Sequence, residues 1–257
     1  MSGETQDTID TVMIYALRRS SYLSTSIKIT QGVKSIARQA YGVDQETDKE
    51  TKNKKLKFVN EAVDKMMDGK KLKADEQPLA TLIHSEVATY ADARKPFDDM
   101  IKAMEIEMAK EAKRLPAYDW AKSVKGLGDK TLALIVGETG DISNYPHPCM
   151  LQKRLGLAPY KGRAGSTHRM KGGLSKDEWI EMGYAPQRRA ILQAYAVDCL
   201  MRAKSPTYYP VYKAERQKFE DRGHDAKHAH WHGCRMMAKA LDRKSTRLNS
   251  SHYRTSR

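Results

Sequence analysis

The residues of this sequence best suited to bind a ligand form the run Lys125-Gly126-Leu127-Gly128-Asp129-Lys130. The two glycines allow the backbone to turn sharply, and the leucine between them can point into a core. A helix that begins at about Asp129 would offer the free N–H groups of its first turn, together with its dipole, to one phosphate. The pattern therefore predicts a helix-hairpin-helix that contacts a nucleic-acid backbone without reading its sequence. An ordinary structural turn is the alternative.

A basic, glycine-rich loop follows, and it contains Ser166. A serine nucleophile needs an activated hydroxyl and cations that hold the charge of the phosphate, and arginines of this loop could do the holding. The alternative is a DNA-contacting loop with an ordinary serine. Ser143 and Ser175 are weaker candidates, and Ser175 before Asp177 and Glu178 favours a helix cap. The residues expected to contact DNA are Lys125, Gly126, Leu127, Gly128, Lys130, Thr131, Lys161, Arg163, His168, Arg169, Lys171, Lys176, Arg188 and Arg189.

A histidine-rich segment lies near the C-terminus, with His224, His228 and His232 at i,i+4 spacing and Cys234 beyond them. This spacing suits two metal ligands on one helix face. A third and a fourth ligand are not evident, so we predict no metal site and no cofactor in this chain. Trp231 is interpreted as a packing residue, as are the tyrosines at positions 208, 209 and 212.

The elements that must position these residues are helices. Apolar residues recur at helical spacing from Ile9 to Ala40, where Gly42 marks a stop, and again from Leu56 to Met67. Pro78 is predicted in the first turn of a helix that reaches Tyr90, and Pro96 is predicted to open a helix with a methionine-rich apolar stripe. That stripe suits a helical-hairpin core shared with the helix from Pro78, a partner surface or a dimer seam.

No alternating strand pattern is present, so we predict an all-α fold. An N-terminal helical hairpin or coiled-coil region (residues 1–113) would precede a compact helical domain (residues 114–241) that contains the helix-hairpin-helix. Within that domain, helices are expected at residues 186–203, 207–221 and 226–241. Residues 242–257 resemble the translation of a sequencing adapter, so we expect the native C-terminus to be cut short near Leu241.

The formal charge of +14 points to a polyanionic partner. Residues 242–257 contribute +4 of this charge, which leaves +10 for the rest of the chain. No segment approaches the ~18 apolar residues of a membrane span, and the polar N-terminus is no signal peptide. Three widely spaced cysteines read as reduced thiols, so we expect a protein of the bacterial cytosol or nucleoid and no membrane partner.

Three motifs follow one another in order: Gly126-Leu127-Gly128, then Gly140-Asp141-Ile142 with Tyr145, then Gly156-Leu157-Ala158-Pro159. This succession, over about Leu115 to Leu241, resembles the C-terminal domain of the DEDD-type insertion-sequence transposases, the one-ten/one-sixteen group. The resemblance implies DNA transposition by an enzyme whose N-terminal RuvC-like domain binds a divalent metal through four acidic residues. It also implies guidance by a structured RNA and a nucleophilic serine after the Gly-Leu-Ala-Pro motif, for which Ser166 is our candidate catalytic residue.

This sequence departs from the family pattern in two places. Residues 1–112 contain no strand that bears a leading metal-binding aspartate, and Ser166 lies beyond Ala164-Gly165, where the family has Ser-Gly. Our leading hypothesis is a transposase-like DNA-binding protein, either a truncated copy or a split part that lacks the nuclease domain. Its candidate partners are a guide RNA, a second copy of itself and a separate RuvC-like subunit. The alternatives are a non-catalytic DNA- or RNA-binding accessory protein, an inactive transposase remnant and a histidine-rich metal-binding regulator.

Overall fold

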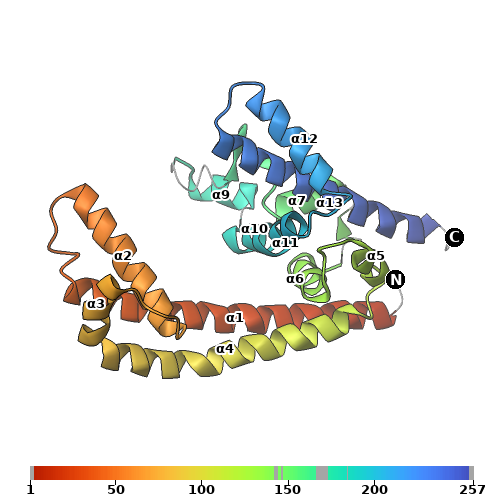
Figure 1. The fold of residues 1–257 in the computed structure, drawn as a ribbon. Coiled ribbons are helices and arrows are strands. Elements are labelled where there is room, and N and C mark those ends of the chain that lie inside the picture. The colour runs from red at the N-terminus through yellow and green to blue at the C-terminus, as the bar shows by residue number, and fades with distance from the viewer. Residues whose placement is uncertain (1–2, 142–143, 146, 166–172, 184, 255–257) are drawn as a thin grey trace. The chain divides into compact units, whose positions relative to one another are not determined.

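The structure is a computed structural model, and it describes residues 3–141, 144–145, 147–165, 173–183 and 185–254 (Figure 1). The side chains of residues 148, 164, 194–195 and 242–254 lie outside the description. The fold is all-α, as predicted. In chain order the elements are α1 (Gly3–Ala40), α2 (Lys49–Met67), η1 (Ala74–Glu76), α3 (Gln77–Leu82), α4 (His84–Ala112), α5 (Tyr118–Ser123), α6 (Asp129–Thr139), α7 (Pro148–Arg154), β1 (Pro159–Tyr160), β2 (Arg163–Ala164), α9 (Lys176–Met182), α10 (Pro186–Ile191), η3 (Leu192–Val197), α11 (Asp198–Arg202), α12 (Tyr209–Glu220) and α13 (Ala226–Arg254).

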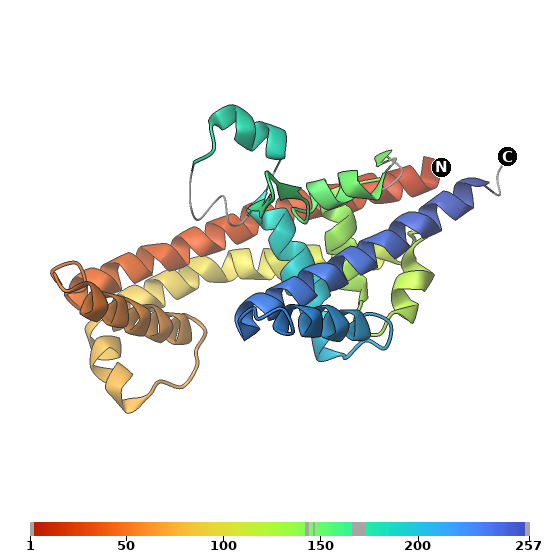
Figure 2. The same ribbon diagram turned by 90° about the horizontal axis from the view of Figure 1, so that it is seen from above.

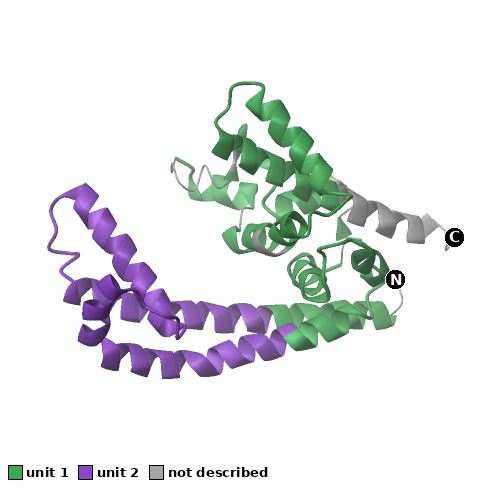
Figure 3. Ribbon diagram, in the orientation of Figure 1, with its two compact units in different colours: residues 1–16, 106–257 green, residues 17–105 purple. Residues whose placement is uncertain are grey.

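The chain divides into two compact units (Figure 3). Unit 1 comprises residues 1–16 and 106–257, and unit 2 comprises residues 17–105. The division falls within α1 and within α4, whereas the sequence placed a boundary near residue 113. The first turns of α1 therefore belong to the unit that holds the predicted DNA-contacting residues.

Unit 2 is built around a core of buried aliphatic side chains from α1, α2, α3 and the start of α4, among them Val33, Val59, Val63, Leu79 and Val87. Two of these helices, α1 and α2, end where the sequence indicates. Gly42 and Gly69 follow α1 and α2 with positive φ angles, as glycine permits. Pro78 lies in the first turn of α3, as predicted, but α3 ends at Leu82.

Two expectations for α4 are wrong. Pro96 lies inside this helix, which begins at His84. The partner of α4 is α1 and not the helix from Pro78, since Arg19 Nε donates to Glu105 Oε1 at 2.8 Å and Ser26 Oγ to Asp98 Oδ1 at 2.8 Å. Proline removes one helical hydrogen bond, and packing along α1 holds the helix together on both sides of it.

Unit 1 has a separate core to which α1, the end of α4, α5, α6, α7, η3, α11, α12 and α13 contribute buried side chains, including Val12, Met108, Leu134, Leu200 and Met237. Within this unit α12 and α13 run side by side (Figure 2). They approach closely because Gly233 has no side chain: a Cβ there would lie 2.9 Å from the carbonyl oxygen of Tyr212. Tyr208 and Tyr212 are buried, as expected for packing residues, whereas Trp231 is 49% exposed.

The helix predicted over residues 186–203 consists of three pieces. Between α10 and α11, residues Leu192–Val197 form a π-helical segment, η3. A π segment inserts extra backbone into a helix and often marks a functional region. The chain then turns at Ser205 into α12, close to where the sequence predicted a break.

Candidate functional site

The predicted phosphate-binding turn connects α5 to α6. The N–H of Leu127 donates to the carbonyl of Val124 at 2.9 Å, and the first hydrogen bond within α6 runs from the N–H of Leu132 to the carbonyl of Gly128 at 3.0 Å. Leu127 is buried at 4% exposure, as predicted. Gly128 is the N-cap residue of α6 and offers no side chain to its first turn. The cap residue therefore supplies no side-chain acceptor to the N–H groups in the first turn of α6.

The two glycines of the turn have different roles. Gly126 has a φ of +98°, and a Cβ there would lie 2.8 Å from the carbonyl oxygen of Cys199 and 2.9 Å from Cβ of Ala203. Gly128 has a φ of −88°, and a Cβ there would meet no atom within 4 Å. Gly126 thus allows α11 to pack on the turn, whereas Gly128 leaves the start of α6 open.

The charges around the turn are mixed. Lys125 and Lys130 are exposed, whereas Thr131 is buried at 5% exposure. The Asp129 carboxylate lies in the first turn of α6 and pairs with Lys113 Nζ at 3.6 Å. Lys113 is a basic residue of this surface that the sequence analysis did not single out.

A β-hairpin carries Lys161 and Arg163. β1 and β2 pair antiparallel, with Lys161 and Gly162 between them. The ammonium of Lys161 forms an ion pair with Glu178 of α9, and the hydroxyl of Tyr160 donates to Glu181 Oε2 at 2.7 Å. The hydrogen bond from Lys161 lowers the pKa of Glu178 to about 2. The hairpin is therefore fixed to α9 by two acidic side chains.

Ser175 caps α9, as predicted. Its Oγ accepts from the N–H of Glu178 at 3.2 Å, and the Glu178 carboxylate accepts from the N–H of Ser175 at 2.8 Å, which completes a capping box. Lys176 follows and is exposed, as is Arg163. The other candidates of this loop lie outside the described residues: Ser166, His168, Arg169 and Lys171.

Arg188 and Arg189 lie on α10, at the other end of α6 from the turn. Arg188 Nε lies 3.5 Å from Glu138 Oε2, and Arg154 Nε donates to the Glu138 carbonyl at 3.2 Å. Asp129 and Glu138 are separated along α6 by about 14 Å at the rise of a helix. The structure thus places the predicted residues in three groups: the turn, the hairpin with α9, and α10.

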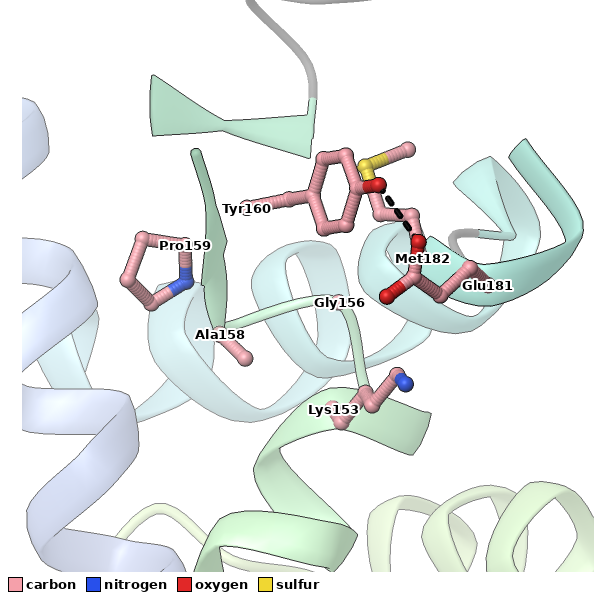
Figure 4. Close-up of a pocket in the computed structure, with 7 residues that line it drawn as sticks. All are labelled: Lys153, Gly156, Ala158, Pro159, Tyr160, Glu181 and Met182. Atoms are coloured by element: carbon pink, nitrogen blue, oxygen red, sulfur yellow. Dashed lines mark hydrogen bonds between the residues drawn. The ribbon is translucent and has the colours of Figure 1, made fainter. Parts of the chain in front are cut away.

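A pocket of about 170 Å³ opens beside the hairpin. Its lining includes Gly156, Ala158 and Pro159, and Tyr160 and Lys153 lie on opposite sides of it (Figure 4). Gly156 ends α7 with a φ of +68°. The Gly-Leu-Ala-Pro motif therefore ends a helix, begins a strand and forms one wall of a pocket.

The histidine-rich segment packs as aromatic rings. The rings of His224, His228 and His232 lie 4.6, 5.7 and 3.6 Å from the Phe219 ring, centroid to centroid. His230 faces another direction, where its Nδ1 lies 2.9 Å from the Tyr212 hydroxyl. Neither the segment nor the rest of the described chain groups three acidic, histidine or cysteine side chains as metal ligands. The divalent metal that the resemblance implies therefore has no ligand set in that part of the chain, and we derive no step through it.

These elements define a helical domain that carries exposed cations on a glycine-containing turn, on a β-hairpin and at a helix start. Residues 119–210 match the model of the transposase IS116/IS110/IS902 family, so this segment is similar to a domain of those transposases. The match confirms the resemblance for the three motifs, which all lie within it. No curated protein and no solved structure shows a significant match to the chain. No helix among the described residues has the length and apolar character to cross a membrane.

Proposed function

We propose that this chain binds DNA in transposition or recombination and that the α5–α6 turn is a phosphate contact. The observation that carries the proposal is the start of α6, where a glycine N-cap leaves backbone N–H groups uncapped between two exposed lysines. A helix N-terminus attracts anions through these groups and through its dipole. The match to a transposase family supports DNA as the partner.

The second and third contacts of the proposal are the hairpin with α9 and the helix α10. Arg163 and Lys176 are exposed there, and Lys161 would exchange Glu178 for a phosphate. Arg189 has no ion pair among the described residues, in contrast to Arg188, which pairs with Glu138. Contacts of this kind set affinity and position, and they make binding strongly dependent on salt.

DNA affinity measured by fluorescence anisotropy over a salt series tests the proposal. Replacing Lys125 and Lys130 together by glutamine should weaken binding roughly tenfold or more and reduce the slope of log affinity against log salt by about 2, about 1 for each lysine. A matched control replaces Lys54 and Lys57 of α2, whose side chains are 75% and 76% exposed. Equal losses in both double variants would show that only total charge matters and would overturn the turn as a phosphate site.

Strand joining is the finer part of the proposal, with Ser166 as nucleophile. A strand-transfer assay on the chain alone, and on the chain with a RuvC-like subunit and guide RNA, compares the wild type with Ser166→Ala. Activity that Ser166→Ala abolishes supports an enzyme. Activity equal in both proteins excludes this serine as the nucleophile.

The alternative is a non-catalytic accessory protein. It is favoured by the helical character of residues 3–112, which contain no strand that could carry the acidic residues of a nuclease domain. DNA or RNA binding without strand transfer under any of these conditions would support it.

A further inference from the structure

The pocket beside the hairpin brings an aromatic, an acidic and a cationic side chain together. Tyr160 of β1 and Lys153 of α7 lie on opposite sides of it, and Glu181 of α9 belongs to the wall between them (Figure 4). The Tyr160 hydroxyl donates to Glu181 Oε2 at 2.7 Å, which holds the carboxylate at the pocket, and the other carboxylate oxygen points into the space between Tyr160 and Lys153. The rest of the lining is apolar or backbone: Gly156, Ala158, Pro159 and the buried Met182.

The two charged groups of this pocket do not neutralise each other. Lys153 is exposed and forms no ion pair or hydrogen bond with a described residue, and the described partner of Glu181 is the Tyr160 hydroxyl. An ammonium only donates hydrogen bonds, and an ionised carboxylate only accepts them. A ligand that pairs with both must therefore carry an acceptor and a donor within one small group. Phosphate does not suit the pocket, because its oxygens would face the negative charge of Glu181.

The size of the pocket limits the ligand further. The volume is about 170 Å³. A cavity of roughly 150 Å³ admits one benzene ring, so the pocket holds a single six-membered ring. The two fused rings of a purine exceed this space. A planar, six-membered ring that carries both a donor and an acceptor is therefore the ligand that fits.

A cation suited to phosphate lies next to the pocket. Tyr160 and Arg163 are directly paired across the hairpin, so their side chains leave it on the same face. Arg163 is exposed and has no ion pair among the described residues. Arginine binds phosphate through its forked donors. A ring in the pocket can thus be joined through a sugar to a phosphate on Arg163, which is the composition of a nucleotide.

We propose that this pocket binds the cytosine base of one unpaired nucleotide in the bound nucleic acid. The amino group of cytosine donates to Glu181, and Lys153 donates to an acceptor on the same edge of the ring. Thymine and uracil carry a carbonyl oxygen where cytosine has its amino group, and the Glu181 carboxylate repels that oxygen. The base must leave the duplex, because this edge otherwise pairs with guanine. The nucleic-acid source of the base rests on the proposed function, whereas the base pocket itself does not.

Free mononucleotides test the pocket directly. Deoxycytidine and deoxyuridine monophosphates differ at the edge of the ring that would face Glu181, and NMR titration of the full chain should show roughly tenfold tighter binding of the first. Glu181→Gln should bind the two about equally, because its amide both donates and accepts. Glu50→Gln, which removes the same charge from an exposed position of α2, should keep the preference. Equal affinities in the wild type, or a preference that Glu181→Gln retains, would overturn the site.

A DNA duplex with one bulged nucleotide then tests the source of the base. In fluorescence anisotropy, a duplex with a bulged deoxycytidine should bind more tightly than one with a bulged deoxyuridine, and Glu181→Gln should remove the difference. Equal affinities for the two duplexes beside a positive mononucleotide result would assign the pocket to a free nucleotide and overturn the nucleic-acid source. Failure of the wild type to bind either duplex would contradict the proposed function and leave the base pocket standing.

Discussion

Gly126 faces the main chain of α11 so closely that a Cβ at this position would lie 2.8 Å from the carbonyl oxygen of Cys199. The contact joins the turn before α6 to a helix more than seventy residues later in the chain. Gly126 is therefore required by the fold, whether or not a phosphate binds nearby.

Gly126→Ala should destabilise the protein by roughly 2–4 kcal/mol, because the new methyl group collides with backbone and the residue must keep a left-handed φ. Urea unfolding of the wild type and the variant measures the loss. A variant as stable as the wild type would mean that α11 does not pack on the turn. A loss of DNA affinity in this variant would therefore reflect the loss of folded structure and would not by itself identify a phosphate contact.

Gly128→Ser separates the phosphate site from the fold. The position is open and has the extended backbone of an N-cap, so a serine hydroxyl there can accept from the first turn of α6. The melting temperature should stay equal or rise slightly. DNA affinity should fall, roughly tenfold, because the hydroxyl occupies the N–H groups that a phosphate would use. DNA affinity that holds or increases would contradict the backbone contact.

Lys161→Gln should raise the pKa of Glu178 from about 2 toward its ordinary value of 4.5. A carboxylate with a lowered pKa contributes stability that is present above about pH 4.5 and is lost as the pH falls toward 2. The Lys161 contribution to acid stability should therefore disappear in the variant. Carboxyl-carbon NMR shifts of Glu178 across this range measure the change, and identical titration curves would show that the ion pair does not form in solution.

The free energy of unfolding also depends on pH through His232, at a higher pH than through Glu178. Burial lowers its pKa below 6.5, the charges of Arg235 and His228 lower it further, and Glu215 raises it. Below pH 6.5 the unfolded chain binds more protons at this site than the folded one, so the free energy of unfolding falls as the pH decreases through the folded pKa.

His232→Gln removes that titration, and the pH dependence of its urea unfolding between about pH 5 and 7.5 should be shallower than that of the wild type. His84→Gln, which changes an exposed histidine of α4, serves as the control. Parallel curves for the wild type and His232→Gln would mean that His232 is not desolvated in the folded protein.

Local rules in the sequence predicted much of the fold. The burial of Leu127, the cap formed by Ser175 and the helix stop at Gly42 depend on residues a few positions apart, and all three are confirmed. Pro96 was misread because the rule for proline is also local. The long contact of α4 with α1, through pairs such as Arg19 and Glu105, decides that helix, and no periodicity within either segment reveals it.

The sequence suggests which residues belong to the candidate site, but it does not indicate which of them contact one another. The exposed lysines of the turn are where the motif indicates, and the family match covers the turn. The sequence did not indicate that Lys161 pairs with Glu178 or that Lys113 lies beside Asp129. Each depends on which elements pack together, and side-chain charge alone does not show that.

The number of residues in the π-helical segment Leu192–Val197 determines which face of α11 is turned toward its neighbours. Deleting one residue from it would turn everything that follows by about 100° around the helix axis. The Cys199 carbonyl and Ala203, which lie next to Gly126, would then face another direction, and a different face of α11 would pack on the α5–α6 turn. Length changes in this helix should therefore be tolerated less readily than most changes of its side chains.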